Sequence, residues 1–301
     1  MAILRDISTE NDARNNNNKE RDDFMKKQHS IAIVNDISGF GRCSITVALP
    51  ILCAMKIQCG ILPTAILSNH TGYPDYTLLD FTEHMDSYLE KWKSLHFSFD
   101  GIYTGYLGSK DQLSVIRHML KSFDFKKIIV DPVMGDDGAL YPAYTQEMCN
   151  SLKQLVTHSS LTTPNVTELC FLTDTPYRED FTEEEIFNMC QILRDSGAKQ
   201  IVVTGIVKGD LIGNLIYEND NFEVLYNKRI LPLRPGTGDV FSAILAGESL
   251  HNIPLKESVK SAANFVETCL TTSSKMEIPI NDGVCFEEHL DMLIPKKNDM
   301  C

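Results

Sequence analysis

The chain has 301 residues, of which 41 are acidic and 28 basic, so its formal net charge is −13. This acidic balance argues against nonspecific binding of nucleic acid, because phosphate contacts need clustered Lys and Arg. The sequence lacks a run of about 18 apolar residues, so we expect no membrane span. A hydrophobic fraction of 43% suits one large α/β domain or two small ones.

The nine cysteines are irregularly spaced and form no CxxC pair. Most lie in apolar segments, as Cys53 and Cys170 do. This usage is typical of reduced thiols in the core of a cytoplasmic protein, and not of a disulfide framework or a zinc site.

Residues 1–28 are polar and mixed in charge, which predicts a disordered extension. Their acidic residues argue against a mitochondrial presequence, and no apolar core of a signal peptide is visible.

From residue 30 onward, predicted strands and helices alternate. Short apolar runs predict buried strands, and these are residues 30–35, 60–67, 101–105, 127–130 and 200–205. Helical spacing predicts helices between them, at residues 43–55, 82–95, 110–121, 144–156, 183–195 and 255–271. A hairpin is expected over residues 211–227, around Asn219 to Asn221. The alternation predicts one doubly wound, mostly parallel α/β sheet with helices on both faces.

Polar side chains follow several of these strands. They are Asp36, residues 68–71, Asp131, residues 163–165 and Thr204. Ligands of open parallel sheets bind at the carboxyl ends of the strands. We therefore expect these side chains to share one rim of the sheet.

The stretch Gly236-Thr237-Gly238-Asp239 precedes an apolar, small-residue run that predicts a buried helix. Two interpretations are open. The stretch is either a turn with a good helix cap or a cradle of free N–H groups that binds an anion. A carboxylate beside such a cradle can take a proton from a hydroxyl, as phosphoryl transfer requires.

Three acids suit a hard cation. Asp131 ends a predicted strand, Asp136 lies in the loop after it, and Glu168 begins a helix after Thr163-Pro164-Asn165. Mg²⁺ prefers oxygen ligands and is usually held by few carboxylates together with substrate phosphates. Each acid alone is compatible with a loop or cap role, but the three together with the Asp239 loop favour a magnesium site.

These motifs resemble those of a known superfamily. DPVMGD at residues 131–136, TPN at 163–165 with Glu168, and GTGD at 236–239 resemble, in this order, the ribokinase-like small-molecule kinases. SNHTGY at residues 68–73 and TGY at 104–106 narrow the resemblance to the pyridoxal kinase family. The resemblance covers roughly residues 30–275 and implies a single kinase domain over residues 29–295.

The resemblance implies ATP-dependent phosphorylation of the 5′-hydroxymethyl group of pyridoxal, pyridoxine or pyridoxamine. Asp239 would be the base, and the N–H groups of Gly236, Thr237 and Gly238 would stabilise the transferring phosphoryl group. Asp131, Asp136 and Glu168 would place Mg²⁺, partly through water. The implied contacts to ATP are Asp131, Thr163, Asn165, Thr204, Gly205 and the three residues of the Gly236–Gly238 cradle.

The vitamer pocket implied by the resemblance consists of Leu67, His70, Thr71 and Tyr106. Asp36 departs from the family, because the common pattern has a Ser-His pair where this chain has Asn35-Asp36. Asp36 followed by Ser-Gly resembles hydroxymethylpyrimidine kinases of thiamine synthesis, which are the main alternative. We expect Asp36 to bind the substrate ring, and it leaves the preferred vitamer open.

Two other functions have some support in the sequence. The turn at Gly39-Phe40-Gly41 follows a strand, as in NAD(P)-dependent dehydrogenases, but no acid lies about 20 residues further on. A non-catalytic vitamer-binding protein is disfavoured by the intact Asp239. The resemblance further implies a cytoplasmic homodimer, and it leaves open a need for a monovalent cation such as K⁺.

Overall fold

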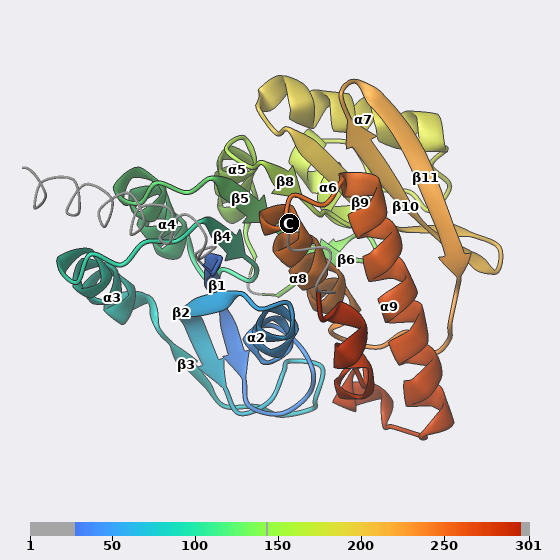
Figure 1. Cartoon of the computed structure of the whole chain (residues 1–301). Coiled ribbons are helices and arrows are strands. Elements are labelled where there is room, and N and C mark those ends of the chain that lie inside the picture. Colours follow the sequence, from blue (N-terminus) through green and yellow to red (C-terminus); the bar gives the residue numbers. More distant parts are fainter. Residues whose placement is uncertain (1–27, 143, 296–301) are drawn as a thin grey trace, which may run out of the picture.

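The computed structural model describes residues 28–142 and 144–295 and contains one large sheet (Figure 1). The sheet has nine strands in the order β11-β10-β9-β8-β5-β4-β1-β2-β3. Neighbours from β2 to β9 pair in parallel, whereas β3, β10 and β11 pair antiparallel. The strands are β1 (Ser30–Ser38), β2 (Gln58–Leu67), β3 (Leu78–Asp80), β4 (Gly101–Thr104), β5 (Lys127–Val130), β8 (Leu161–Thr162), β9 (Gln200–Lys208), β10 (Leu211–Glu218) and β11 (Asn221–Lys228).

Helices cover both faces of the sheet, and the alternation of side chains along each strand feeds two cores. Ala32 and Val34 of β1 pack into one core, while Ile31 and Ile33 pack into the other. The first core lies under α3 (Thr82–Ser94), α4 (Lys110–Ser122), α5 (Gln146–Val156), α6 (Val166–Thr173) and α7 (Glu183–Ser196). The second lies under α2 (Ile45–Ala54), α8 (Thr237–Leu250) and α9 (Leu255–Lys275), which group together in Figure 1. The predicted doubly wound fold is confirmed.

Local sequence signals set the ends of several helices. Capping boxes start α6 at Asn165 and α7 at Thr182. Gly197 ends α7 with φ of 128°, in the left-handed region that favours glycine at a helix C-terminus. These termini fix where the loops at the carboxyl ends of the strands begin.

The structure also departs from the predicted elements. β1 continues through Asp36 to Ser38, three residues beyond the predicted end of this strand at residue 35. The hairpin of β6 (Gly135–Asp136) and β7 (Ala139–Leu140) lies where a loop was predicted, and the short edge strand β3 was not predicted, because strands of two or three residues carry no periodic signal. Two 3-10 helices, η1 (Ile280–Asp282) and η2 (Glu287–Leu293), follow α9.

The expected extension of residues 1–28 lies almost wholly outside the described residues, which begin at Gln28. Among the described helices, none is long and apolar enough to cross a membrane.

Candidate active site

The start of α8 forms a backbone cradle. Gly236 precedes the helix with φ of 81°, and a Cβ at this position would lie 1.8 Å from the main-chain oxygen of Arg42, so only glycine fits. No side chain caps the helix, and nothing lies within 4 Å of where a Cβ of Gly238 would be. Thr237 Oγ1 donates to the oxygen of Arg234 at 3.3 Å. The first N–H groups of α8 are therefore open to an anion.

Asp239 lies in the first turn of α8 and is partly exposed. Loss of hydration among the surrounding protein atoms, with a smaller contribution from the nearby carboxyl of Asp36, raises the pKa of its carboxyl to about 6. The backbone N–H of Ser44 and the side chain of Asn35 lower that pKa. A carboxylate with a pKa near 6 is well suited to accept a proton at neutral pH.

Asn35, a residue to which the sequence argument gave no role, holds this corner together. Its Oδ1 accepts hydrogen bonds from the N–H groups of Asp36 at 2.9 Å and Tyr106 at 2.8 Å. A Cβ on Gly105 would lie 2.4 Å from its Nδ2, so glycine is needed there. Nδ2 is buried without a hydrogen bond in the described structure, yet its side chain lowers the pKa of Asp239. The amide is thus fixed with its donor beside the acid.

Asp131 lies below the cradle, at the end of β5, where its N–H donates to Thr104 O at 2.9 Å. Burial and, to a smaller extent, the charge of Asp239 raise the pKa of its carboxyl to about 8, against the lowering effect of the Ser242 hydroxyl. Ser242 belongs to α8 and shares a 2.9 Å hydrogen bond with Thr163 Oγ1. Asp131, Asp239 and Thr163 are therefore gathered at one place. This was predicted for Asp131 and Thr163, which follow strands, and Asp239 joins them from the first turn of α8.

Glu168 and Asn165 form the capping box of α6. Glu168 accepts hydrogen bonds from the N–H groups of Asn165 at 2.8 Å and Met134 at 3.2 Å. Asn165 Oδ1 accepts from Glu168 N at 2.8 Å, and its Nδ2 donates to Gly135 O at 2.9 Å. The side chain of Asn165, which we expected to contact ATP, is engaged in positioning Glu168.

The predicted magnesium ligands are near one another but do not form a closed cage. Burial raises the pKa of Glu168 well above its usual range, and the nearby Asp131 and Asp136 raise it further. Partial loss of hydration raises the pKa of Asp136 as well, although its side chain is exposed. Within the described residues, no group of three or more His, Cys, Asp or Glu side chains is arranged to hold a metal ion. Clustered carboxylates that resist ionisation suit a cation whose coordination shell is completed by water and phosphate oxygens.

The remaining predicted ATP residues lie on β9 beside α6. Thr204 N donates to Pro164 O at 3.0 Å, and Thr204 and Asn165 form an isolated parallel β-bridge. Gly205 is exposed, with φ of 80° and nothing within 4 Å of an added Cβ. Both residues thus lie next to the helix start that carries Glu168.

The predicted vitamer residues differ in their surroundings. Leu67 is buried and Thr71 is exposed. Tyr106 is half-buried, with its ring 5.9 Å from that of Tyr144 in an edge-on arrangement. Asp36 is buried and accepts a 3.0 Å hydrogen bond from Ser38 Oγ. Burial raises the pKa of the Asp36 carboxyl.

His70 is buried, and both of its ring nitrogens are engaged by protein groups. Nδ1 lies 3.0 Å from the Gly72 N–H and Nε2 lies 2.6 Å from Asn281 O. These two contacts fix the orientation of the His70 ring, which the resemblance implied to line the vitamer pocket.

A segment that sequence reasoning missed ties these loops together. We call residues 278–287 the C-terminal clasp. Its contacts are Arg234 Nη2 to Ile278 O at 2.8 Å, His70 Nε2 to Asn281 O at 2.6 Å, Tyr73 Oη to Asp282 Oδ1 at 2.6 Å, Arg42 Nη1 to Asp282 O at 3.0 Å and Arg42 Nε to Glu287 Oε1 at 2.7 Å. No periodic pattern marks this segment, so only the folded chain shows its role.

Comparison with known proteins gives a consistent answer. The family model of phosphomethylpyrimidine kinase matches residues 85–283. A Bacteroides thetaiotaomicron protein assigned to the phosphomethylpyrimidine kinases is 35% identical over 91% of this chain and 96% of its own, with a TM-score of 0.87, and another crystal form of it contains pyridoxal. Pyridoxal kinase from Lactobacillus plantarum is 26% identical over 89% of this chain and 97% of its own, with a TM-score of 0.84.

Among curated relatives, pyridoxine kinase of Bacillus subtilis is 28% identical over 63% of this chain and 69% of its own. These matches favour the predicted kinase over a dehydrogenase. The chain is a kinase of the phosphomethylpyrimidine kinase family and, within it, belongs with the pyridoxal kinases of the ribokinase-like superfamily.

Proposed function

We propose that this kinase transfers the γ-phosphoryl group of ATP to the 5′-hydroxymethyl group of pyridoxal, pyridoxine or pyridoxamine. The observation that carries the proposal is the position of Asp239, a partly exposed acid with a pKa of about 6 beside the open N–H groups of an uncapped helix. The pyridoxal bound by the 33%-identical Bacteroides protein and the names of the relatives support the substrate class.

The chain's own residues would divide the reaction between them. ATP, when bound, supplies the transferable phosphoryl group. Asp239 accepts the proton of the substrate hydroxyl, and Asn35 keeps the pKa of this acid from rising further. The N–H groups of Gly236, Thr237 and Gly238 point at the developing negative charge and stabilise it without moving.

Mg²⁺ suits the acids behind the cradle. The nearby Asp131 raises the pKa of Glu168, so a bound cation would relieve the cost of ionising both. Asp136 is exposed and would contribute through water. Thr204 and Gly205, beside α6, would line the polyphosphate, as would Thr163 and Asn165 from positions that support Ser242 and Glu168. K⁺ is an additional candidate that the resemblance raises.

The substrate ring would be recognised by the predicted vitamer residues and Asp36. Asp36 would accept a hydrogen bond from a ring substituent or pair with an amino group. Leu67 and Tyr106 would supply apolar wall, and Thr71 would close over the ring from its exposed loop.

We also propose a homodimer in the cytoplasm. Ile66, Leu78 and Leu79 are exposed together where β2 pairs with β3 at the edge of the sheet, and Leu79 is 57% exposed. Such an apolar edge is usually covered in the assembled protein. A Leu79→Asp variant that remains dimeric in sedimentation would contradict this interface.

The cytoplasmic location has separate support. The cysteines that the structure describes are free thiols, which supports a reducing compartment.

The deciding experiment is an ATP-dependent kinase assay on each of the three vitamers and on hydroxymethylpyrimidine. The family model and Asp36-Ile37-Ser38-Gly39 favour hydroxymethylpyrimidine as the second candidate substrate. We expect turnover of at least one vitamer to exceed that of hydroxymethylpyrimidine. Turnover of hydroxymethylpyrimidine alone would assign the chain to thiamine synthesis. Asp36→Ser, tested in the same assay, would report whether Asp36 sets the vitamer preference.

A further inference from the structure

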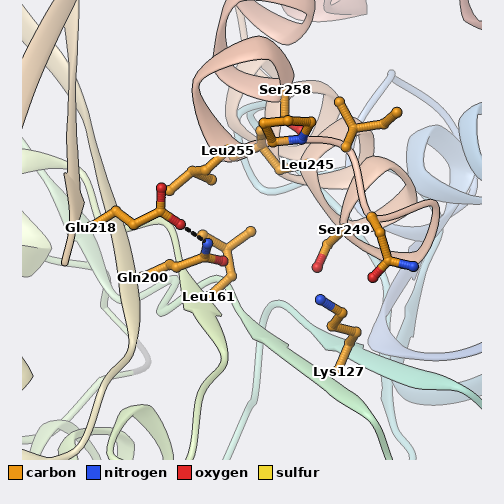
Figure 2. A pocket seen from close by; sticks show the side chains of 11 residues that line it. Lys127, Leu161, Gln200, Glu218, Leu245, Ser249, Leu255 and Ser258 are labelled. Carbon is orange, nitrogen blue, oxygen red and sulfur yellow. Dashed lines mark hydrogen bonds between the residues drawn. The ribbon is translucent and has the colours of Figure 1, made fainter.

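A second cavity lies at the opposite end of the sheet from the active site (Figure 2). Its floor is made by Lys127, Leu161 and Gln200, the first residues of the parallel strands β5, β8 and β9. The cavity measures about 290 Å³. Because catalytic residues follow the carboxyl ends of these strands, a ligand bound here cannot touch the reacting atoms.

Two donors without partners face this cavity. Figure 2 shows the ammonium of Lys127 and the hydroxyl of Ser249 directed toward each other and into the open space. Ser249 is only 9% exposed, and neither its hydroxyl nor the Lys127 ammonium has a hydrogen-bond or ion-pair partner in the described part of the chain. The neighbouring Lys126, by contrast, pairs with Asp100 at 3.2 Å. The hydroxyl of this nearly buried residue and the unpaired ammonium beside it are two donors open to a ligand in the cavity.

The start of α9 adds further donors at the edge of the cavity. Pro254 precedes this 21-residue helix and provides no side-chain cap, and Pro254 and Leu255 both line the cavity. The first N–H of the helix to find a backbone acceptor is that of Ser258, which donates to Pro254 O at 3.0 Å. The earlier N–H groups, from Leu255 to Glu257, have no partner in the described structure. Together with the helix dipole they favour a negative charge.

The opposite wall is built from acceptors. The Gln200 side chain donates to the carboxylate of Glu218, and both side chains face the cavity from the β9–β10 side (Figure 2). Glu218 therefore stands across the cavity from Lys127 and Ser249. A carboxylate on the wall opposite the donors suits the hydroxyl groups of a ligand whose anionic end is held by the donors.

We propose that this cavity binds the phosphate group of a small phosphomonoester or free phosphate through Lys127, Ser249 and the start of α9. The ammonium supplies the charge, and the hydroxyl and N–H groups supply directed hydrogen bonds to several phosphate oxygens. The site is separate from the proposed reaction and does not depend on which vitamer is phosphorylated. Because α8 begins at the catalytic cradle and ends beside Ser249, the two sites share one helix.

The test is thermal unfolding of the full-length protein with inorganic phosphate or glycerol 3-phosphate as the probe. Mg²⁺ and AMP-PCP are present at saturation so that the catalytic cradle is filled. We expect a rise in Tm of roughly 3 °C once the probe exceeds its dissociation constant about tenfold. Lys127→Met should abolish this rise, and Ser249→Ala should weaken probe binding severalfold. Lys126→Met is the matched control and should keep the full rise.

Phosphate also stabilises proteins through the solvent, but this effect is common to all four proteins and cancels in the comparison. Stronger binding of glycerol 3-phosphate than of inorganic phosphate would identify a phosphomonoester site, and equal binding a site for the free ion. Equal rises in wild type, Lys127→Met and Ser249→Ala, or no rise in the wild type, would overturn the proposal. Unchanged Tm without probe and unchanged turnover of Lys127→Met would show that the variant is folded.

Discussion

The imidazole of His70 is joined to the main chain of Asn281, with Nε2 and the carbonyl oxygen 2.6 Å apart. The other ring nitrogen, Nδ1, accepts a hydrogen bond from the Gly72 N–H at 3.0 Å, which assigns the ring proton to Nε2. The ring therefore spans from the loop of residues 68–73 to the C-terminal clasp. Residues 211 positions apart in the sequence are held together by one side chain.

We expect His70→Ala to lower the free energy of unfolding by roughly 2 kcal/mol, because it removes a buried ring and leaves two polar groups unpaired. Loosening of the loop should also raise KM for the vitamer. Urea unfolding followed by circular dichroism measures the first effect. Thr71→Ala, one residue away and exposed, should leave stability within about 0.5 kcal/mol. A His70→Ala variant with wild-type stability and a raised KM would show that the ring serves the substrate instead.

Asn35→Asp tests the amide beside the base. The change keeps an oxygen that accepts from Asp36 and Tyr106 but replaces the Nδ2 donor with a potential negative charge. Asn35 lowers the pKa of Asp239, so its loss should raise that pKa above about 6. The base would then be protonated at neutral pH, and the acidic limb of kcat/KM should move to higher pH by about one unit or more.

The measurement is a pH profile of kcat/KM for wild type and Asn35→Asp. Asn150→Asp, an exposed residue of α5, is the control and should leave the profile unchanged. A lower activity at every pH with no shift of the acidic limb would mean that Asn35 acts on something other than Asp239.

Much of the fold follows from local signals in the sequence. The short apolar runs placed the buried strands, and the motifs after them placed Asp131 and Glu168 at one rim, because parallel strands end on the same side. Contacts between residues that are far apart in the sequence leave no such local pattern. The Asn281 carbonyl that engages His70 is a backbone group, which any residue supplies. Residues 278–287 show no periodicity, so the clasp could not be anticipated.

The role of Asn35 was hidden for a different reason. Its identity shows only a polar residue at the end of a strand, compatible with a turn or with ring binding. Its function depends on the two N–H groups that fix its oxygen and on Gly105, against which its amide packs. Those neighbours come from β1 and the loop after β4, and their register is known only from the folded sheet.

The two glycines of the cradle should respond differently to alanine. Gly238→Ala meets no protein atom within 4 Å, so stability should be unchanged or higher by about 0.5–1 kcal/mol. The added methyl group would occupy space next to the free N–H groups, and kcat should fall at least tenfold. Gly236→Ala would clash with Arg42 O and force an unfavourable φ, so we expect a loss of several kcal/mol of stability. Thermal melts beside initial rates separate the two cases. Wild-type activity of Gly238→Ala would rule out a phosphate at this turn.

Asp239→Ala should lower kcat by two or more orders of magnitude and leave the Kd for the vitamer nearly unchanged, because the base acts only on the proton of the reacting hydroxyl. Asp137→Ala, at an exposed position in the β6–β7 turn, should lower kcat less than twofold. Stopped assays and equilibrium binding of the vitamer in the absence of ATP measure the two quantities. A loss of turnover smaller than tenfold would remove Asp239 from the role of base.

Asp131→Asn should weaken the response to Mg²⁺ without unfolding the protein. The pKa of Asp131 is about 8, so the metal-free folded protein at pH 7 holds this group protonated, and asparagine has nearly the same shape and charge as the protonated acid. A cation must displace that proton. In the wild type, the Mg²⁺ concentration for half-maximal rate should therefore fall as pH rises from 7 to 9. In Asp131→Asn this pH dependence should be lost, and the Mg²⁺ concentration for half-maximal rate should be at least tenfold higher. Asp136→Asn, at an exposed position, should show a smaller change. Titration of the rate with Mg²⁺ at three pH values decides the matter, and an unaltered pH dependence in Asp131→Asn would assign the metal to other ligands.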